Sequence, residues 1–302
     1  MLQVHVGDTI TFTSIVSEPH DVFIYGGHSV PPLIVPSPTA GEGLIINPEL
    51  AFPAPVANPW MGGFAISPLF AGPTHQWNLT VGAAGTYNYT CAVHYPGMQA
   101  VLEVLPVTSA IAIPSPAEVS KMVKAQIAAL EKKAAKVFAK LNKKASMSKP
   151  KKNSDGTKTH TVWVGGSAAN HVIDFVWFFP HKITVGPSDT VVFQFSLTND
   201  APHVIAFLNG APEPELLLVK PQASGPPHLQ FNPSIAFPSG GAPTGPVSRT
   251  GIWNSGLISP FDATTGAPSN VTIKLDNVAK GSMPYVCALH YSSGMVGELI
   301  VK

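Results

Sequence analysis

Most of this 302-residue chain consists of two copies of one sequence pattern. Residues 7–27 (GDTITFTSIVSEPHDVFIYGG) match residues 188–210 (SDTVVFQFSLTNDAPHVIAFLNG), and residues 87–104 match residues 285–301. Two more matches lie between these, LIINPELAFP (44–53) with LQFNPSIAFP (229–238) and GGFAISPLF (62–70) with NSGLISPFD (254–262). Because the order and approximate spacing are kept, the simplest account is a duplicated domain, and the length also suits two domains.

Both copies contain short segments in which apolar and polar residues alternate. Examples are HQWNLTV (75–81) and AVLEVL (100–105) in the first copy, and VTIKL (271–275) and GELIVK (297–302) in the second. Alternation with β-branched and aromatic residues is typical of half-buried strands, and the 26 glycines and 31 prolines supply turns between them. The sequence therefore predicts an all-β fold with two Greek-key sandwich or barrel domains.

The second copy has additional residues at its start. HTVWVGG (160–166) is typical of a strand, whereas the first copy begins only at LQVHVG (2–7). We expect domain 1 to lack its opening strand and the natural chain to extend upstream of Met1. The alternative is that domain 1 folds without that strand.

The segment between the copies predicts a helix. Residues 117–145 are rich in helix formers and contain no glycine or proline, and Pro116 suits the first turn. Apolar residues in this segment follow a heptad rhythm, at Val123, Ile127, Leu130, Ala134, Val137 and Leu141. Such a helix either lies on its own domain or forms a short coiled coil that oligomerises the protein. A flexible linker is expected at 148–156, which gives domain 1 as 1–112, a helical linker as 113–158 and domain 2 as 159–302.

Positive charge is concentrated in this middle segment. The net charge is only +1, but residues 117–158 contain 12 lysines against three acidic residues, so the flanking copies are mildly acidic. We predict no nucleic-acid partner, because no aromatic platform or known binding motif accompanies the lysines. No run of about 18 apolar residues occurs, so we also predict no transmembrane span.

Each copy ends in a loop that carries Cys, His and Met, and each has a Pro-His pair far upstream. The residues are His20, Cys91, His94 and Met98 in the first copy and His203, Cys287, His290 and Met295 in the second. A thiolate, two imidazoles and a thioether form a soft set that suits copper in both of its oxidation states. A lone histidine is more often structural, and a single Cys–His pair also fits a thiol nucleophile. The complete set occurs twice. This repetition favours metal binding over a structural histidine, over a thiol nucleophile and over a disulfide between the two cysteines.

These residues resemble the ligands of the cupredoxins. Cys287, His290 and Met295 have the plastocyanin-like spacing, whereas the spacing of the first copy is one residue shorter, between that and the amicyanin-like loop. The resemblance covers the chain outside 113–158. It implies a cupredoxin fold, one type 1 (blue) copper ion per domain, electron-carrier activity with redox protein partners, and a location in the periplasm, outside the cell or at its surface.

The chain also departs from the pattern of this family. In plastocyanin-like proteins an Asn often follows the first His, whereas here Asp21 and Val204 occupy the two equivalent positions. The resemblance therefore does not fix the residues that surround each metal site and tune it.

Two other functions are weighed against electron transfer. Two-domain copper oxidases and nitrite reductases bind further coppers through additional histidines, but this sequence contains no His-x-His pair. The residues beside the two cysteines are Thr90, Ala92, Val286 and Ala288, none of them the histidine that those enzymes place there. Copper storage or delivery favours Met-rich sites, and only seven methionines are present. We therefore predict an electron carrier rather than an enzyme.

Asn78, Asn88 and Asn270 begin Asn-x-Ser/Thr tripeptides, a weak signal for glycosylation.

Overall fold

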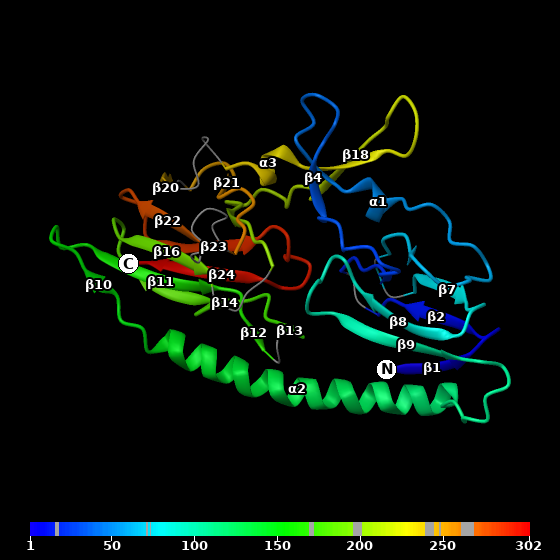
Figure 1. Ribbon diagram of the computed structural model, residues 1–302. Coiled ribbons are helices and arrows are strands. Elements are labelled where there is room, and N and C mark those ends of the chain that lie inside the picture. Colours follow the sequence, from blue (N-terminus) through cyan, green and yellow to red (C-terminus); the bar gives the residue numbers. More distant parts are fainter. Residues whose placement is uncertain are drawn as a thin grey trace. The chain divides into compact units, whose positions relative to one another are not determined.

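The chain forms two compact units, which are described here separately. Unit 1 contains Met1–Ala129 together with Val219–Gln230, and unit 2 contains Leu130–Leu218 together with Phe231–Lys302. The predicted domain limits at 112 and 158 stay a prediction. The computed structural model (Figure 1) describes residues 1–15, 18–70, 72, 74–168, 172–195, 201–238, 245–247, 249–260 and 269–302. Parts of the matched segments 7–27 and 188–210 lie outside these ranges.

Unit 1 is built on a five-stranded sheet with the order β1-β9-β8-β3-β6, and β2 pairs with β7 in a second sheet. The bounds are β1 Leu2–His5, β2 Thr9–Thr13, β3 Phe23–Ile24, β6 Ala65–Ile66, β7 Gln76–Thr80, β8 Gly85–Thr90 and β9 Gln99–Leu105. A further sheet has the order β18-β19-β5-β4, with β4 at Ile34–Pro36, β5 at Leu44–Ile46, β18 at Leu217–Lys220 and β19 at His228–Phe231. Its strands β5 and β19 pair antiparallel through Ile45 and Gln230, which both belong to unit 1.

Unit 2 repeats this plan with more strands. Its five-stranded sheet has the order β15-β24-β23-β17-β21, and its six-stranded sheet has the order β10-β11-β16-β22-β20, with β14 also on β11. The bounds are β10 Lys151–Lys152, β11 Lys158–Val164, β14 Phe178–Phe179, β15 Lys182–Val185, β16 Thr190–Phe195, β17 Ile205–Phe207, β20 Gly245–Val247, β21 Trp253–Asn254, β22 Asn270–Leu275, β23 Gly281–Cys287 and β24 Val296–Val301. A small hairpin joins β12 (Ser167–Ala168) to β13 (Ile173–Asp174).

The sheet orders show the duplication directly. Each strand of β1-β9-β8-β3-β6 has its sequence equivalent at the same place in β15-β24-β23-β17-β21. Two short helices also correspond, α1 (Pro48–Ala51) and α3 (Pro233–Ala236), and they are capped by the equivalent residues Asn47 and Asn232. The all-β prediction and the duplication are both confirmed.

One of the sequence matches is wrong by four residues. Residues 62–70 were paired with 254–262, which places Ser67 opposite Ser259. In the structure Ser67 Oγ accepts the N–H of Val22, and Ser255 Oγ accepts the N–H of the equivalent Ile205. The short motif Ile-Ser-Pro, which occurs at both places, produced the wrong register.

The two units differ at the edge of β2. In unit 2, β16 pairs with β22 on one side and with β11, in parallel, on the other. Its equivalent β2 pairs with β7, and no other strand among the described residues adds to that sheet. Unit 1 thus lacks the counterpart of β11 within the described part of the chain.

The predicted helix is present as α2 (Pro116–Ser146). It begins with a capping box, in which the side chains of Ser115 and Glu118 each accept the other residue's backbone N–H. Its second half packs on unit 2, where the Phe138 ring lies within 5.7 Å of the Trp177 ring and 5.2 Å of the Phe179 ring.

The segment expected to be a flexible linker contains part of a hairpin, because β10 pairs antiparallel with the start of β11. No helix in the described part of the chain is both long and apolar enough to cross a membrane.

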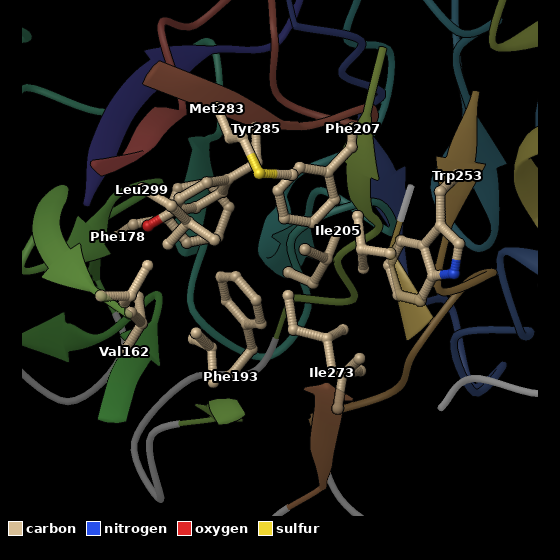
Figure 2. Close-up of a cluster of buried hydrophobic side chains, with 14 of the residues drawn as sticks. Val162, Phe178, Phe193, Ile205, Phe207, Trp253, Ile273, Met283, Tyr285 and Leu299 are labelled. Atoms are coloured by element: carbon tan, nitrogen blue, oxygen red, sulfur yellow. The ribbon is translucent and has the colours of Figure 1, made fainter. Parts of the chain in front are cut away.

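The buried residues that alternate along the strands of unit 2 form an apolar core (Figure 2). The ring of Tyr285 lies at its centre, with the rings of Phe178, Phe193 and Phe207 within 4.9–5.7 Å. Burial of each such side chain contributes on the order of 1.5–3 kcal/mol. The same core contains Cys287 and Met295, so the best-packed part of the unit extends to the predicted metal ligands.

Candidate metal centres

Three predicted ligands of unit 2 converge to within hydrogen-bond distances. Cys287 Sγ lies 3.4 Å from His203 Nδ1 and 3.4 Å from His290 Nδ1, and the two nitrogens are 3.2 Å apart. His203 and Cys287 are fully buried. His203 thus meets Cys287, 84 positions later in the sequence, and His290, and the three side chains direct electron-pair donors to one point.

The sheet and the loop of unit 2 hold this arrangement through the backbone. His203 precedes β17 and forms an isolated bridge with Ile258, and Cys287 is the last residue of β23. The N–H of Cys287 donates to the carbonyl of Met295 (3.0 Å), and the N–H of Met295 donates to the carbonyl of His290 (3.1 Å). These two bonds close the loop between β23 and β24 and hold the backbone of the candidate ligands in place.

Unit 1 brings its equivalent residues together in the same way. Cys91 Sγ lies 3.7 Å from His20 Nδ1 and 3.4 Å from His94 Nδ1. The loop is closed by the same two bonds, from Cys91 N–H to the carbonyl of Met98 (3.0 Å) and from Met98 N–H to that of His94 (3.1 Å). We call the cluster of His20, Cys91 and His94 site 1, and the cluster of His203, Cys287 and His290 site 2. Site 1 is thus a second copy of site 2.

The two predicted methionine ligands have different surroundings. Met295 is fully buried, whereas Met98 is 50% exposed. Tyr95, in the same loop as Met98, is also 50% exposed. Site 1 is therefore more open to solvent than site 2.

Burial sets the ionisation of both sites. It raises the pKa of Cys91 to about 12, with a further contribution from the Asp21 carboxylate, and it raises the pKa of Cys287 to about 11. Burial also lowers the pKa of His20, against the opposing effect of Glu18, and lowers that of His203 well below its ordinary value. Burial thus favours the neutral imidazole, the form that binds metals, at His20 and His203, and it favours a thiol whose proton leaves when a metal binds at each cysteine.

Asp21 and Val204, which follow the first histidine of each unit, make different contacts. Asp21 is 3% exposed, and its Oδ1 accepts the N–H of Ala92 at 2.6 Å. Val204 is fully buried, and its carbonyl accepts the N–H of Ala288 at 3.2 Å. The same backbone contact is therefore made by a carboxylate in site 1 and by a peptide group in site 2.

Two features near the ligands were not predicted. Glu18 Oε2 lies 3.9 Å from His94 Nε2, and Ser67 and Ser255 hold the backbone two residues beyond each first histidine. Glu18 is close to His20 in the sequence and could have been noticed. The serines gave no signal, because the match of 62–70 to 254–262 separated them.

The spacing of the ligand atoms fits a single metal ion. Bonds of about 2.0–2.3 Å from imidazole nitrogen and thiolate sulfur, spread around one ion, place the donor atoms roughly 3.4–3.8 Å apart. The observed separations, 3.2–3.4 Å in site 2 and 3.4–3.7 Å in site 1, are close to this range. Two imidazoles and a thiolate form a soft set that suits copper. Within the described residues, these two clusters are the groups of His, Cys, Asp and Glu side chains that could hold a metal.

Comparison with solved structures returns copper proteins. Plastocyanin from Dryopteris crassirhizoma is 19% identical over 47% of this chain and 99% of its own, with a TM-score of 0.25. Auracyanin from Roseiflexus castenholzii is 18% identical over 48% of this chain and 96% of its own, also at 0.25. The copper nitrite reductase of Thermus scotoductus is 13% identical over all of this chain and 59% of its own, at 0.22. No family model and no curated protein matches the chain.

Proposed function

We propose that this chain, which has a cupredoxin fold, is a copper protein that carries electrons through two mononuclear type 1 sites. The observation that carries the proposal is the convergence of His203 Nδ1, His290 Nδ1 and Cys287 Sγ within 3.4 Å of one another, repeated by the equivalent residues of unit 1. Copper in such a set supplies reversible one-electron chemistry between its two common oxidation states.

The protein contributes a rigid and mostly dry set of ligands. His20, Cys91 and His94 would hold one ion and His203, Cys287 and His290 the other, with Met98 and Met295 as weak fourth ligands. Backbone hydrogen bonds fix each loop from both strands, so the ligand atoms have little room to move when an electron arrives. Such a pre-formed site lowers the reorganisation that accompanies electron transfer.

The edges of the sites suggest where redox partners bind. His94 uses Nδ1 toward the cysteine and turns Nε2 toward the side of Glu18, and its side chain is 32% exposed. The neighbouring Tyr95 and Met98 are both half-exposed. A partner protein docked on this apolar rim would approach the ligands of site 1 closely. We further propose that the protein works outside the cytoplasm, where partners of this kind occur.

The test is a copper titration of the purified apo-protein, followed by visible absorption and electron paramagnetic resonance. We expect intense thiolate-to-copper absorption that saturates at two ions per chain and falls by about half in Cys91→Ser and in Cys287→Ser. Assays for nitrite and oxygen reduction on the loaded protein separate a carrier from an enzyme. Turnover of either substrate, together with more than two coppers per chain, would replace the proposal by a catalytic role. Binding without thiolate absorption would favour copper storage.

A further inference from the structure

The two sites differ in the charge that surrounds the first histidine. In unit 1 the sequence around it is Glu18-Pro-His20-Asp21, and in unit 2 it is Ala201-Pro-His203-Val204. Two acidic residues in one copy are thus replaced by two small apolar residues in the other. The backbone at both places is the same, since His20 and His203 form equivalent isolated bridges, with Phe70 and Ile258.

Both acidic side chains of unit 1 act on the ligand cluster. Asp21 is 3% exposed, and its Oδ1 accepts the N–H of Ala92, the residue after Cys91. Glu18 Oε2 lies 3.9 Å from His94 Nε2. In unit 2 a carboxylate, that of Glu213, also acts on Cys287, and its effect is smaller than those of burial and of the backbone hydrogen bonds.

The two sites also differ in solvent access, and site 1 is the more exposed of the two. Met295 is fully buried, as is His203, whereas Met98 is 50% exposed. Water stabilises the state with the higher charge, and so do nearby carboxylates. With two imidazoles and a thiolate, Cu(II) gives a site of net charge +1 and Cu(I) a neutral one. Both differences therefore favour the oxidised form in site 1 and the reduced form in site 2.

We infer that site 1 has the lower reduction potential, set by the acidic residues Glu18 and Asp21, and that site 2 is the stronger oxidant. A partly reduced protein then holds its electron on site 2. Site 1 suits a more reducing donor, and site 2 holds the electron delivered to the chain. This inference rests on the proposed function, since it concerns the same two clusters. Glu18 and Asp21 are positioning and charge residues here, not ligands.

The experiment compares the two sites one at a time. Cys287→Ser leaves only site 1 and Cys91→Ser leaves only site 2, and each copper-loaded variant is titrated by spectroelectrochemistry at its thiolate absorption band. We expect the lower potential for site 1. In the full chain, half an equivalent of reductant per copper should bleach the band of site 2 first.

Substitutions within unit 1 test the cause. In the Cys287→Ser protein we expect Asp21→Asn to raise the potential of site 1, because the amide oxygen still accepts the Ala92 N–H while the charge is removed. Glu18→Ala, at a side chain that is 35% exposed, should raise it by a smaller amount. Glu103→Gln is the matched control, because Glu103 lies on β9 and bonds Gln3, away from the cluster. The potential of site 1 in the Glu103→Gln variant should equal that in the Cys287→Ser parent.

The outcomes separate this inference from the proposed function. Absence of thiolate-to-copper absorption in both single-site proteins overturns the proposed function and the inference with it. Two such sites with equal potentials, or with the higher potential in site 1, overturn the inference alone. An unchanged potential in Asp21→Asn and Glu18→Ala, with the absorption band intact, overturns the role assigned to these two charges.

Discussion

Gly297 on β24 leaves no room for a side chain. A Cβ atom there would lie within 2.5 Å of the ring of Tyr285, and that ring is enclosed on all sides by the core of unit 2. We expect Gly297→Ala to lower the free energy of unfolding of unit 2 by about 1–3 kcal/mol, as overpacked cores do. Urea unfolding followed by tryptophan fluorescence measures the loss.

Gly166→Ala is the control for this prediction, because its Cβ would touch the Phe175 ring at an ordinary contact distance of 3.8 Å and would closely approach only the end of the Leu141 side chain, at 3.1 Å. That flexible end can move aside, so the free energy of unfolding should change little. Equal losses in the two variants would mean that crowding against Tyr285 is not the cause.

Asp189 links the start of β11 to the turn before β16. Its carboxylate accepts the N–H groups of Lys158 (2.8 Å) and Gly186 (2.7 Å) and bonds His160 Nε2 (2.8 Å). Burial alone would raise the pKa of Asp189, but the two amides and the histidine hold it below its ordinary value. A carboxylate with a depressed pKa stabilises the fold above the pKa of the unfolded chain, about 3.9, and this contribution is lost as the pH falls through the folded value.

Asp189→Asn should therefore destabilise unit 2 at pH 7 by about 1.5–3 kcal/mol, the usual range for hydrogen bonds to a charged group. The difference from the parent should shrink below about pH 4. Denaturation at several pH values provides the test. The equivalent Asp8 accepts the N–H of His5 in a half-buried turn, whereas Asp189 binds two N–H groups and a histidine, so Asp8→Asn should cost less. A loss that does not depend on pH would contradict the ionised role.

The candidate ligands could be predicted from the sequence because Cys, His and Met in fixed spacing are typical of a metal site and occur twice. The residues around them could not be. Ser67 and Ser255 act through a hydroxyl on a backbone N–H, and serine is too common for such a role to be visible. Asp21 was visible only as a departure from a pattern, and its contact with Ala92 required the fold.

At the scale of elements, the two halves of α2 have different surroundings. The ring of Phe138 packs against Phe175, Trp177 and Phe179 of unit 2, whereas Ile127 is 40% exposed. We expect Phe138→Ala to destabilise unit 2 by about 1–3 kcal/mol, less than a fully buried Phe. Ile127→Ala should leave stability nearly unchanged, and thermal unfolding by circular dichroism compares the two.

The same pair of variants tests the coiled-coil alternative, which stays a prediction. Light scattering on the parent and on Ile127→Ala gives the molar mass of each. An oligomer that dissociates in Ile127→Ala would show that the heptad stripe of α2 joins copies of the chain. Equal masses for both would favour a helix that serves its own chain.

Elements with local signals were predicted well, and those that depend on distant pairing were not. The limits of α2 follow from Pro116, the Ser115–Glu118 box and the absence of glycine. The β10 strand was missed because Lys151 and Lys152 are polar and become a strand only beside β11. The pairing of β19 with β5 has no local signature at all.

At the scale of the whole molecule, bound copper should contribute to the stability of both units. An ion that binds only the folded state adds about 2.7 kcal/mol at a free concentration 100 times its dissociation constant. We expect removal of copper by a chelator to lower the melting temperature of the protein. In Cys287→Ser, copper should protect unit 1 and no longer unit 2. Calorimetry with and without copper measures this, and an unchanged melting temperature would contradict tight binding.

Unit 1 is made of two pieces of chain, and this has a consequence for any cut in the backbone. Residues 219–230 belong to unit 1 although the residues on either side of them belong to unit 2. A protease that cleaves between 147 and 157 would yield two fragments on a denaturing gel. The native particle should nevertheless elute undivided, because the second fragment still supplies two strand segments to the first unit. The duplicated sequence can be divided in the middle, but the folded protein cannot.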